Sequence, residues 1–558
     1  IERLLDMQTW PIFPKIKFST FKEYFEEIEK VQEELPVVND ELNFVFTGCY
    51  TTQTRIKQGN RITENSLVEA ETFNTFSDII DVYDYDNNKF FEGWENVLLN
   101  QFHDILPGSG TIDTREHAMG KYQDTLAVAG SKRKLALRNI SENIDTSQLV
   151  SDNEDDKETT SEGAGVGFGV DNFKVAQTSR DKGKKRIFHI FNSASFPRNE
   201  VVEFVVWDYQ GDKDQIVMKN DKGENISYQI KDDGFNHYWG HKYIKIMVEV
   251  EVPACGYSTY IMQEKDSHEL PELTDPNPRV DNVEEFKLEN DLIKVTFDKK
   301  NGALTSFIDK ATGREYIEEE KSGIFRLIDE DDSKGMTSWR VGRYMKMNPL
   351  NEGVKVKRIM DGDLRQAIQL ETSFRDSQLK AVISLDKNSK NLNYKVECDW
   401  QESGEKGDKI PQLNYILPLN YECNNYKYDI PFGTIDREDM DRDVPGNSFA
   451  AGIPENQNQK LMMLITDSKY GFRGKDNSLA VTLIRGAFDP DPYPELGKHE
   501  FNFSINLMEY KSNKELIDQS HIYNHPLQVM SGSMQKGNLE TSKSFLKQTG
   551  GNSVISSI

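Results

Sequence analysis

The chain has 558 residues, 36% of them hydrophobic and 10% aromatic, and a net charge of −25 at neutral pH. An anionic surface of this size repels phosphate backbones, which argues against a general nucleic-acid binder. No run of about 18 apolar residues is present, so the sequence offers no membrane-spanning helix. An aromatic-rich but polar chain of this length is typical of several globular domains with large β surfaces.

Apolar residues at helical spacing characterise the first part of the chain. Thr20-Phe21-Lys22-Glu23 matches a capping box, and a stripe of apolar residues follows it up to Val31. Further stripes run over residues 67–80, 94–105 and 119–140. Four helices with short links would pack as a bundle, which we place at residues 18–145. Residues 146–185 are acidic, rich in Gly, Ser and Thr and without periodicity, so we expect a linker or long loop there.

The periodicity then changes from 3.6 residues to two. Apolar residues alternate with polar ones from Ile244 to Val252 and again from Ile293 to Phe297, before a hairpin turn at Asn301-Gly302. We expect a small β-sandwich at 186–268 and a large one at 269–558. Regular helix should be scarce after Lys185, with no core helix of ten residues or more. The predicted fold class is multidomain, an all-α helical bundle followed by all-β sandwich domains.

The four cysteines are Cys49, Cys255, Cys398 and Cys423, and none forms a CxxC pair. Long gaps between them suit neither a disulfide framework nor a zinc-finger pattern. We expect four unpaired thiols in a reducing compartment, and therefore a cytoplasmic protein.

One candidate for chemistry is the stretch NQFHDILPGS at residues 100–109. Asn100, His103 and Asp104 stand at i, i+3 and i+4, and we expect them on the face opposite the apolar residues Trp94, Leu98, Phe102 and Ile105. An imidazole beside a carboxylate can supply a metal ligand and a sugar or second-shell contact. The alternative is a surface histidine at the last turn of a helix, where it suits the dipole. No HxD, HxH or HExxH cluster elsewhere would complete a zinc site.

A second candidate is FTGCYTTQ at residues 46–53. The rings of Phe46 and Tyr50 could stack on a sugar, with hydroxyls beside them; equally, Tyr50 could belong to the bundle core. The acidic runs 329–332 and 436–443 could hold calcium or supply catalytic carboxylates. Both lack the glycine of a calcium loop, so we expect solvated loops.

For two further segments the sequence favours a structural role. Residues 485–499, RGAFDPDPYPELGKH, are rich in Pro and Asp, and we expect a structured loop between strands. His237 and His241 could share a metal only on a helix; their surroundings indicate a strand.

The stretch WENVLLNQFHDILPGS at 94–109 resembles the signature of the zinc-dependent α-mannosidases of glycoside hydrolase family 38. TGCYTTQ, followed by Arg55, Lys57 and Arg61, resembles that family's (T/S)-G-x-Y-T-(T/S) helix start. NDLIKVTFDKKNGALTSFIDKATGREY looks like the entry to its large β domain, and RGAFDPDPYPELGKHEF like a loop within it. Cys49 departs from the family pattern, which favours a small residue or Tyr there.

The resemblance implies an α/β catalytic domain, a helical bundle and β-sandwich domains, of which this chain matches the second and third. Residues 1–17 would then be the tail of the catalytic domain, and the last β unit would be truncated. By resemblance, His103 is a metal ligand, and Asp104 contacts the sugar in the catalytic site. Phe46, Tyr50 and Arg485 would be substrate-binding. The nucleophilic Asp and the remaining metal ligands are expected outside this chain.

The resemblance therefore implies a retaining, exo-acting α-mannosidase with Zn²⁺ or another divalent metal in the intact protein. These residues alone are expected to be inactive and to bind metal weakly or not at all. An alternative is a mannosyl-glycerate or phospho-mannoside hydrolase of the same family. Another is a non-catalytic carbohydrate-binding or scaffold protein. Expected partners are α-mannoside oligosaccharides or glycosides and, in a homodimer, a second copy of the chain; neither nucleic acid nor membrane is expected.

Overall fold

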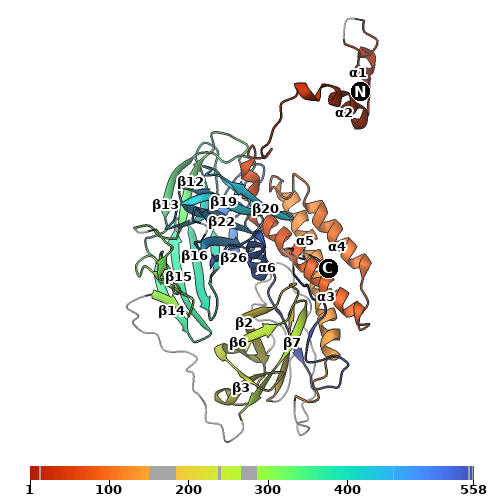
Figure 1. The fold of residues 1–558 in the computed structure, drawn as a ribbon. Helices are drawn as coiled ribbons and strands as arrows, with labels where there is room; N and C mark the ends of the chain where they lie inside the picture. Colours follow the sequence, from red (N-terminus) through yellow and green to blue (C-terminus); the bar gives the residue numbers. More distant parts are fainter. Residues whose placement is uncertain are drawn as a thin grey trace. The chain divides into compact units, whose positions relative to one another are not determined.

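A computed structural model of the chain divides into two compact units, Ile1–Phe44 and Val45–Ile558 (Figure 1). Most of the predicted linker and His237 lie outside the described residues. The structure describes residues 1–11, 14–149, 184–236, 240–265, 286–318, 320–456, 458–550, 553, 555 and 557–558.

The first unit holds the short helices α1 (Glu2–Met7) and α2 (Phe21–Ile28) and the 3₁₀ helix η1 (Glu29–Glu34). The Thr20 hydroxyl caps α2 by accepting a hydrogen bond from the Glu23 backbone N–H at 3.2 Å, as the capping box predicts. The apolar residues of α2 are nevertheless exposed, with Phe21 at 88%. The predicted stripe at 21–31 is therefore not a buried face.

Three long helices form a bundle in the second unit. They are α3 (Thr54–Ile79), α4 (Asn87–Asn100) and α5 (Ile112–Glu142). Leu67, Phe90, Val97 and Ala129 make one buried cluster between them. Gly59 of α3 lies against Tyr122 of α5, where a Cβ would come within 2.5 Å of the ring, so a glycine allows this close helix approach.

The first β region consists of two antiparallel sheets. One has the strand order β27-β1-β7-β3-β4 with β28 paired to β7, and the other has the order β2-β6-β5. The last two described strands, β27 and β28, thus pair with strands of this region. The periodicity of the sequence does not indicate this pairing. The strands are β1 (Arg186–Asn192), β2 (Arg198–Trp207), β3 (Ile216–Asn220), β4 (Asn225–Ile226), β5 (Tyr228–Asn236), β6 (His241–Val252), β7 (Gly256–Glu264), β27 (Gln528–Gly532) and β28 (Ser542–Ser544), with the 3₁₀ helix η4 (Lys213–Gln215).

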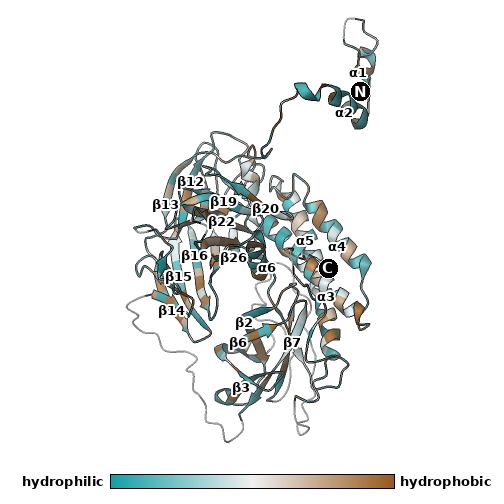
Figure 2. Cartoon of the chain, in the orientation of Figure 1, coloured by the Kyte–Doolittle hydropathy of each residue, from teal (hydrophilic) through white to brown (hydrophobic). Residues whose placement is uncertain are grey.

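The predicted strand from Ile244 to Val252 is confirmed in β6, where its apolar residues are buried; Figure 2 colours the hydropathy along the chain. His241 begins this strand, as its surroundings indicate. The strand at Ile293–Phe297 is confirmed as β9, and Gly302 at the turn after it has φ +65.

The second β region contains a four-stranded, a six-stranded and a nine-stranded sheet. Their orders are β11-β10-β9-β8, then β13-β12-β18-β25-β24-β21, then β14-β15-β16-β17-β26-β23-β22-β19-β20. The strands are β8 (Phe286–Glu289), β9 (Ile293–Phe297), β10 (Leu304–Asp309), β11 (Arg314–Glu315), β12 (Ile324–Asp331), β13 (Tyr344–Pro349), β14 (Lys355–Asp361), β15 (Arg365–Phe374), β16 (Ser377–Asp386), β17 (Asn391–Trp400), β18 (Lys409–Pro418), β19 (Cys423–Ile430), β20 (Gly433–Arg437), β21 (Val444–Pro445), β22 (Phe449–Pro454), β23 (Leu461–Thr466), β24 (Gly471–Lys475), β25 (Ser478–Arg485) and β26 (Gly497–Met508).

Aromatic rings join the two larger sheets into a sandwich. Tyr394 of β17 and Phe503 of β26 stack at 4.4 Å between ring centroids. Phe325 of β12 and Tyr415 of β18 pack on them from the six-stranded sheet, with 4.9 Å between Tyr415 and Phe503. A helical bundle followed by β-sandwich domains is therefore the fold, as the sequence predicts. None of the described helices is long and apolar enough to cross a membrane.

One prediction about the β region is wrong. The helix α6 (Asn513–Asn524) has 12 residues, and its Leu516 is fully buried against Phe449, Met463 and Ile465. A capping box at its start could have revealed it, because Ser512 and Glu515 each bond the other's backbone N–H. Between two strands the short segment lacks a long apolar stripe, so periodicity alone misses it.

We predict that Leu516→Ala lowers the free energy of unfolding by about 2–4 kcal/mol, because it leaves a cavity between α6 and the sheet. The measurement is urea denaturation of the chain. Lys511→Ala, an exposed change just before the helix, is the matched control and should cost less than about 1 kcal/mol. Equal effects of the two variants would contradict the assignment of α6 to the core.

Candidate functional site

The residues of the FTGCYTTQ motif form a tight turn before α3. Thr47–Tyr50 are the 3₁₀ helix η2, and Gln53 then takes the left-handed conformation with φ +50. The Gly48 N–H donates to Trp339 O at 2.9 Å. A Cβ on Gly48 would lie 2.8 Å from Ser338 O, so a residue without a side chain is needed where this turn meets the 333–342 loop.

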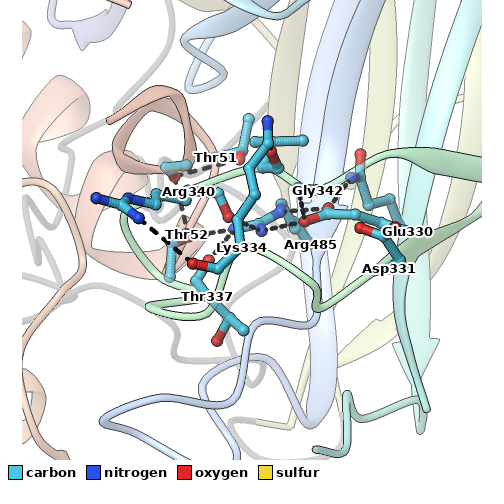
Figure 3. Close-up of polar contacts among 12 residues, drawn as sticks. Thr51, Thr52, Glu330, Asp331, Lys334, Thr337, Arg340, Gly342 and Arg485 are labelled. Atoms are coloured by element: carbon cyan, nitrogen blue, oxygen red, sulfur yellow. Dashed lines mark hydrogen bonds and ion pairs between the residues drawn. The ribbon is translucent and has the colours of Figure 1, made fainter. Parts of the chain in front are cut away.

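Arg485 holds this turn to the β region. It is fully buried, and its Nε and Nη2 donate to the two carboxylate oxygens of Glu330 at 2.8 and 2.6 Å. Its Nη1 donates to Thr52 Oγ1 at 3.0 Å and to Thr337 O at 2.7 Å, and Nη2 also reaches Arg340 O (Figure 3). All three guanidinium nitrogens therefore bond within the chain. A substrate contact by Arg485 stays a prediction; its contacts here are those of an anchor.

The acidic run at 329–332 is not a solvated loop, which corrects the sequence interpretation. Asp329, Glu330 and Asp331 belong to strand β12 and are each less than a tenth exposed. Each carboxylate pairs with an arginine: Asp329 with Arg375, Glu330 with Arg485 and Asp331 with Arg343. These partners lie 12, 46 and 155 positions away from their carboxylates, so the run alone gives no sign of them. Most of the second run, 436–443, is partly exposed, but its Asp443 is buried and pairs with Arg473.

Lys57, on the first turns of α3, ties the two sequence motifs together. Its ammonium donates to Leu106 O and Pro107 O at 3.1 Å each and also to Thr52 O. The side chain is 3% exposed, and burial lowers the pKa of Lys57 to about 7. The turn after α4 and the turn before α3 are thus held side by side.

His103 and Asp104 lie on the turn that follows α4. The His103 Nε2 and an Asp104 carboxylate oxygen are 3.4 Å apart, and the side chains are 79% and 57% exposed. The prediction that His103 points away from the bundle core is confirmed. Burial raises the pKa of the thiol of Cys49, which lies on the turn before α3.

The face of α4 that is buried differs from the predicted one. Phe90, Gly93, Val97 and Asn100 face the bundle, and Asn100 donates to Ala118 O at 2.9 Å. Leu98 and Phe102 are 60% and 51% exposed. These four buried residues are spaced at i, i+3, i+7 and i+10, which puts their row one residue away from the predicted apolar stripe. Gly93 and Asn100 of this row carry no hydrophobic signal, so the sequence pattern misses it.

Phe46 and Tyr50 flank the same turn. Phe46 is 42% exposed, and the Arg340 guanidinium lies 5.9 Å from its ring centroid. Tyr50 is half-buried beside Gly471 of β24. An exposed aromatic ring of this kind can stack on the apolar face of a sugar.

A metal site would need more ligands than this turn supplies. A zinc site takes three or four protein ligands. The described part of the chain holds no group of three or more His, Cys, Asp or Glu side chains placed to bind one ion. His103 fits one position of such a donor set and does not by itself form a site. The four cysteines are unpaired, as predicted.

Two protein-family models match the chain. Residues 45–140 match the alpha mannosidase middle domain, and residues 288–493 match the glycosyl hydrolases family 38 C-terminal domain. Alpha-mannosidase G of Dictyostelium discoideum is 24% identical over 90% of this chain and 44% of that protein. An alpha-mannosidase of Saccharomyces cerevisiae is 23% identical over 94% of this chain and 41% of that protein. The chain therefore spans less than half the length of these relatives.

Solved structures share the fold. A family 38 glycosyl hydrolase from Enterococcus faecalis matches with a TM-score of 0.73 and 17% identity, over 98% of this chain and 67% of that one. An alpha-mannosidase structure from the same organism matches with a TM-score of 0.73 and 16% identity, over 98% and 66%. These structures share a helical domain joined to β-sandwich domains. The two family models together match more than half of the chain, which therefore belongs to glycosyl hydrolase family 38 and carries that family's middle and C-terminal domains.

We predict that Arg485→Met and Glu330→Leu each lower the free energy of unfolding by about 3–5 kcal/mol, because each leaves the other charge buried without a partner. The double variant should lose much less than the sum. The measurement is a double-mutant cycle by urea denaturation. Arg343→Ala is the control, since Arg343 is 81% exposed beside Asp331 of the same strand. Additive losses would show that the pair does not act as a unit.

Lys57 predicts a dependence of stability on pH. Its pKa is about 7 in the folded chain, and an unfolded lysine titrates near ~10.4. Between these values the unfolded state binds more protons, so stability rises with pH. The difference in unfolding free energy between the wild type and Lys57→Met should therefore move in favour of the wild type by about 1.4 kcal/mol per pH unit from pH 7.5 to 9.5. Urea midpoints at three pH values test this; a constant difference would contradict it.

Proposed function

We propose that the whole protein is a retaining α-mannosidase that removes terminal α-mannose residues. The observation that carries this proposal is the exposed His103–Asp104 pair, held by Lys57 against the turn that bears Phe46 and Tyr50. The family membership of the chain supports it. Retaining glycosidases use one carboxylate as nucleophile and another as acid and base. By the resemblance, the nucleophile belongs to a catalytic domain that these 558 residues do not supply.

In this proposal the residues of the chain bind and orient the sugar. His103 contributes a neutral imidazole to the metal, and Asp104 accepts a hydrogen bond from a sugar hydroxyl. Phe46 packs on the apolar face of the ring, with Tyr50 beside it. A zinc ion, when bound, would supply a Lewis acid and a template for the sugar hydroxyls. Lys57, Arg485 and Glu330 hold the turns that present these groups.

A second candidate is a hydrolase for mannosyl-glycerate or a phosphorylated mannoside. The half-buried guanidinium of Arg340 over the Phe46 ring favours it, since arginine suits carboxylate and phosphate. Comparing hydrolysis of neutral and 6-phosphorylated mannosides by the wild type and Arg340→Gln separates the two candidates. The third reading, a non-catalytic carbohydrate-binding or scaffold protein, requires that the full-length protein hydrolyse neither. A cytoplasmic location and a homodimer remain part of the proposal.

We predict that His103→Ala in the full-length protein lowers both zinc content and turnover of a nitrophenyl α-mannoside, by roughly 100-fold or more in turnover, because a metal ligand is lost. Metal analysis and initial rates measure the two effects. His117→Ala, at an exposed histidine of α5, is the matched control and should change neither. The 558-residue chain alone should bind zinc weakly and show no hydrolysis. Unimpaired turnover in His103→Ala, or stoichiometric zinc at His103 in the chain alone, would contradict the assigned role.

A further inference from the structure

A cleft of about 920 Å³ lies on the nine-stranded sheet, on the side away from the sandwich core. Its lining comes from strands β15, β16, β17 and β26, from α6, and from β2 of the first β region. This volume is in the range of binding sites for small ligands, which is about 300–1,000 Å³. None of the residues predicted for the hydrolytic site lines it.

Strand register explains why the floor is polar. Ser384 of β16 stands opposite Asn393 of β17, and Asn391 of β17 stands opposite Asn506 of β26. Side chains alternate along a strand, so these residues lie on the face opposite that of Phe503, whose ring belongs to the sandwich core. The face turned to the cleft therefore carries amides and hydroxyls in neighbouring rows.

Several of these polar groups have unused hydrogen-bonding capacity. Among the described residues, the side chains of Ser384 and Asn393 make no hydrogen bond with another residue. Asn506 is 3% exposed and donates to Asn391 Oδ1, but its own Oδ1 has no partner in the described part of the chain. Amides and hydroxyls both donate and accept, so they match the hydroxyls of a carbohydrate. A nearly buried acceptor without a partner is costly unless a ligand or water supplies a donor.

The charges of the cleft balance, because its lining holds six cationic and six acidic side chains, and this balance favours a neutral ligand over an anionic one. Arg198 and Arg365 are the arginines of its lining, and each is bound to a carboxylate of the same chain, Glu200 and Asp386. Their guanidinium groups are therefore engaged and do not offer a bidentate site for phosphate or carboxylate. Ala367 and Val382 of the floor add apolar surface, against which the less polar face of a sugar ring can pack.

We propose that this cleft binds a neutral oligosaccharide through Ser384, Asn393 and Asn506. The site is separate in its residues from the proposed hydrolytic function and does not depend on it. The proposal gives the second β region a binding role of its own.

The test is saturation-transfer NMR and calorimetry of the 558-residue chain with an α-linked mannotriose, with maltotriose and cellotriose as other neutral probes and mannose 6-phosphate as an anionic one. We expect binding of at least one neutral trisaccharide. Asn393→Ala should weaken it about five-fold, the equivalent of one lost hydrogen bond. Ser384→Trp, which fills the floor, should abolish it. Thermal melts test whether each variant is folded. If Ser384→Trp does not fold, the binding measured for Asn393→Ala tests the proposal.

Two controls separate this cleft from other surfaces. Asn458→Ala and His117→Ala change exposed residues outside the lining, and neither should alter trisaccharide binding. Absence of binding to all three neutral trisaccharides would overturn the proposal. So would undiminished binding in Asn393→Ala, an equal loss of binding in Asn458→Ala, or binding of the anionic probe alone.

Discussion

The buried ion pair between Arg485 and Glu330 is the constraint on which the arrangement of this site depends. Both side chains are fully buried, and removing a single partner would leave an uncompensated charge. The pair occurs at the end of β25 and near the end of β12, and the free edge of the guanidinium reaches Thr52 at the start of the helical bundle. One cation therefore sets the distance between two strands, one loop and the turn before α3.

The loop between β25 and β26 makes a second attachment to the same helix. Glu495 accepts hydrogen bonds from the Thr54 N–H and hydroxyl at 2.7 and 2.6 Å, although it is 441 positions away. A carboxylate at the first turn of α3 satisfies orphan donors and suits the helix dipole. Asp491 of the same loop pairs with Arg115 at the first turn of α5 at 2.8 Å. This loop of the β region therefore caps α3 and holds the first turn of α5 through an ion pair, which explains why it is rich in carboxylates.

Sequence patterns predict the parts of this structure that local physics decides. Alternation identifies β6 and β9, helical spacing identifies α3 to α5, and the motifs locate the His103 turn on the surface. The patterns fail where distant partners decide. Asp329 to Asp331 resemble a solvated run until Arg375, Arg485 and Arg343 are placed beside them. The buried face of α4 is set by Gly93 and Asn100, which fit against α3 and α5 but carry no hydrophobic signal.

The segments that resemble the family contain residues with two different physical roles, which the sequence alone does not separate. His103, Asp104 and Phe46 are exposed and can meet a ligand directly. Thr52, Lys57 and Arg485 are buried, with their polar atoms bonded inside the chain. A substitution in the first group removes a contact to the ligand while the fold is retained. A substitution in the second group moves the turn itself, and so acts on stability and geometry together. Loss of activity alone would therefore not distinguish them, whereas activity measured beside unfolding free energy does.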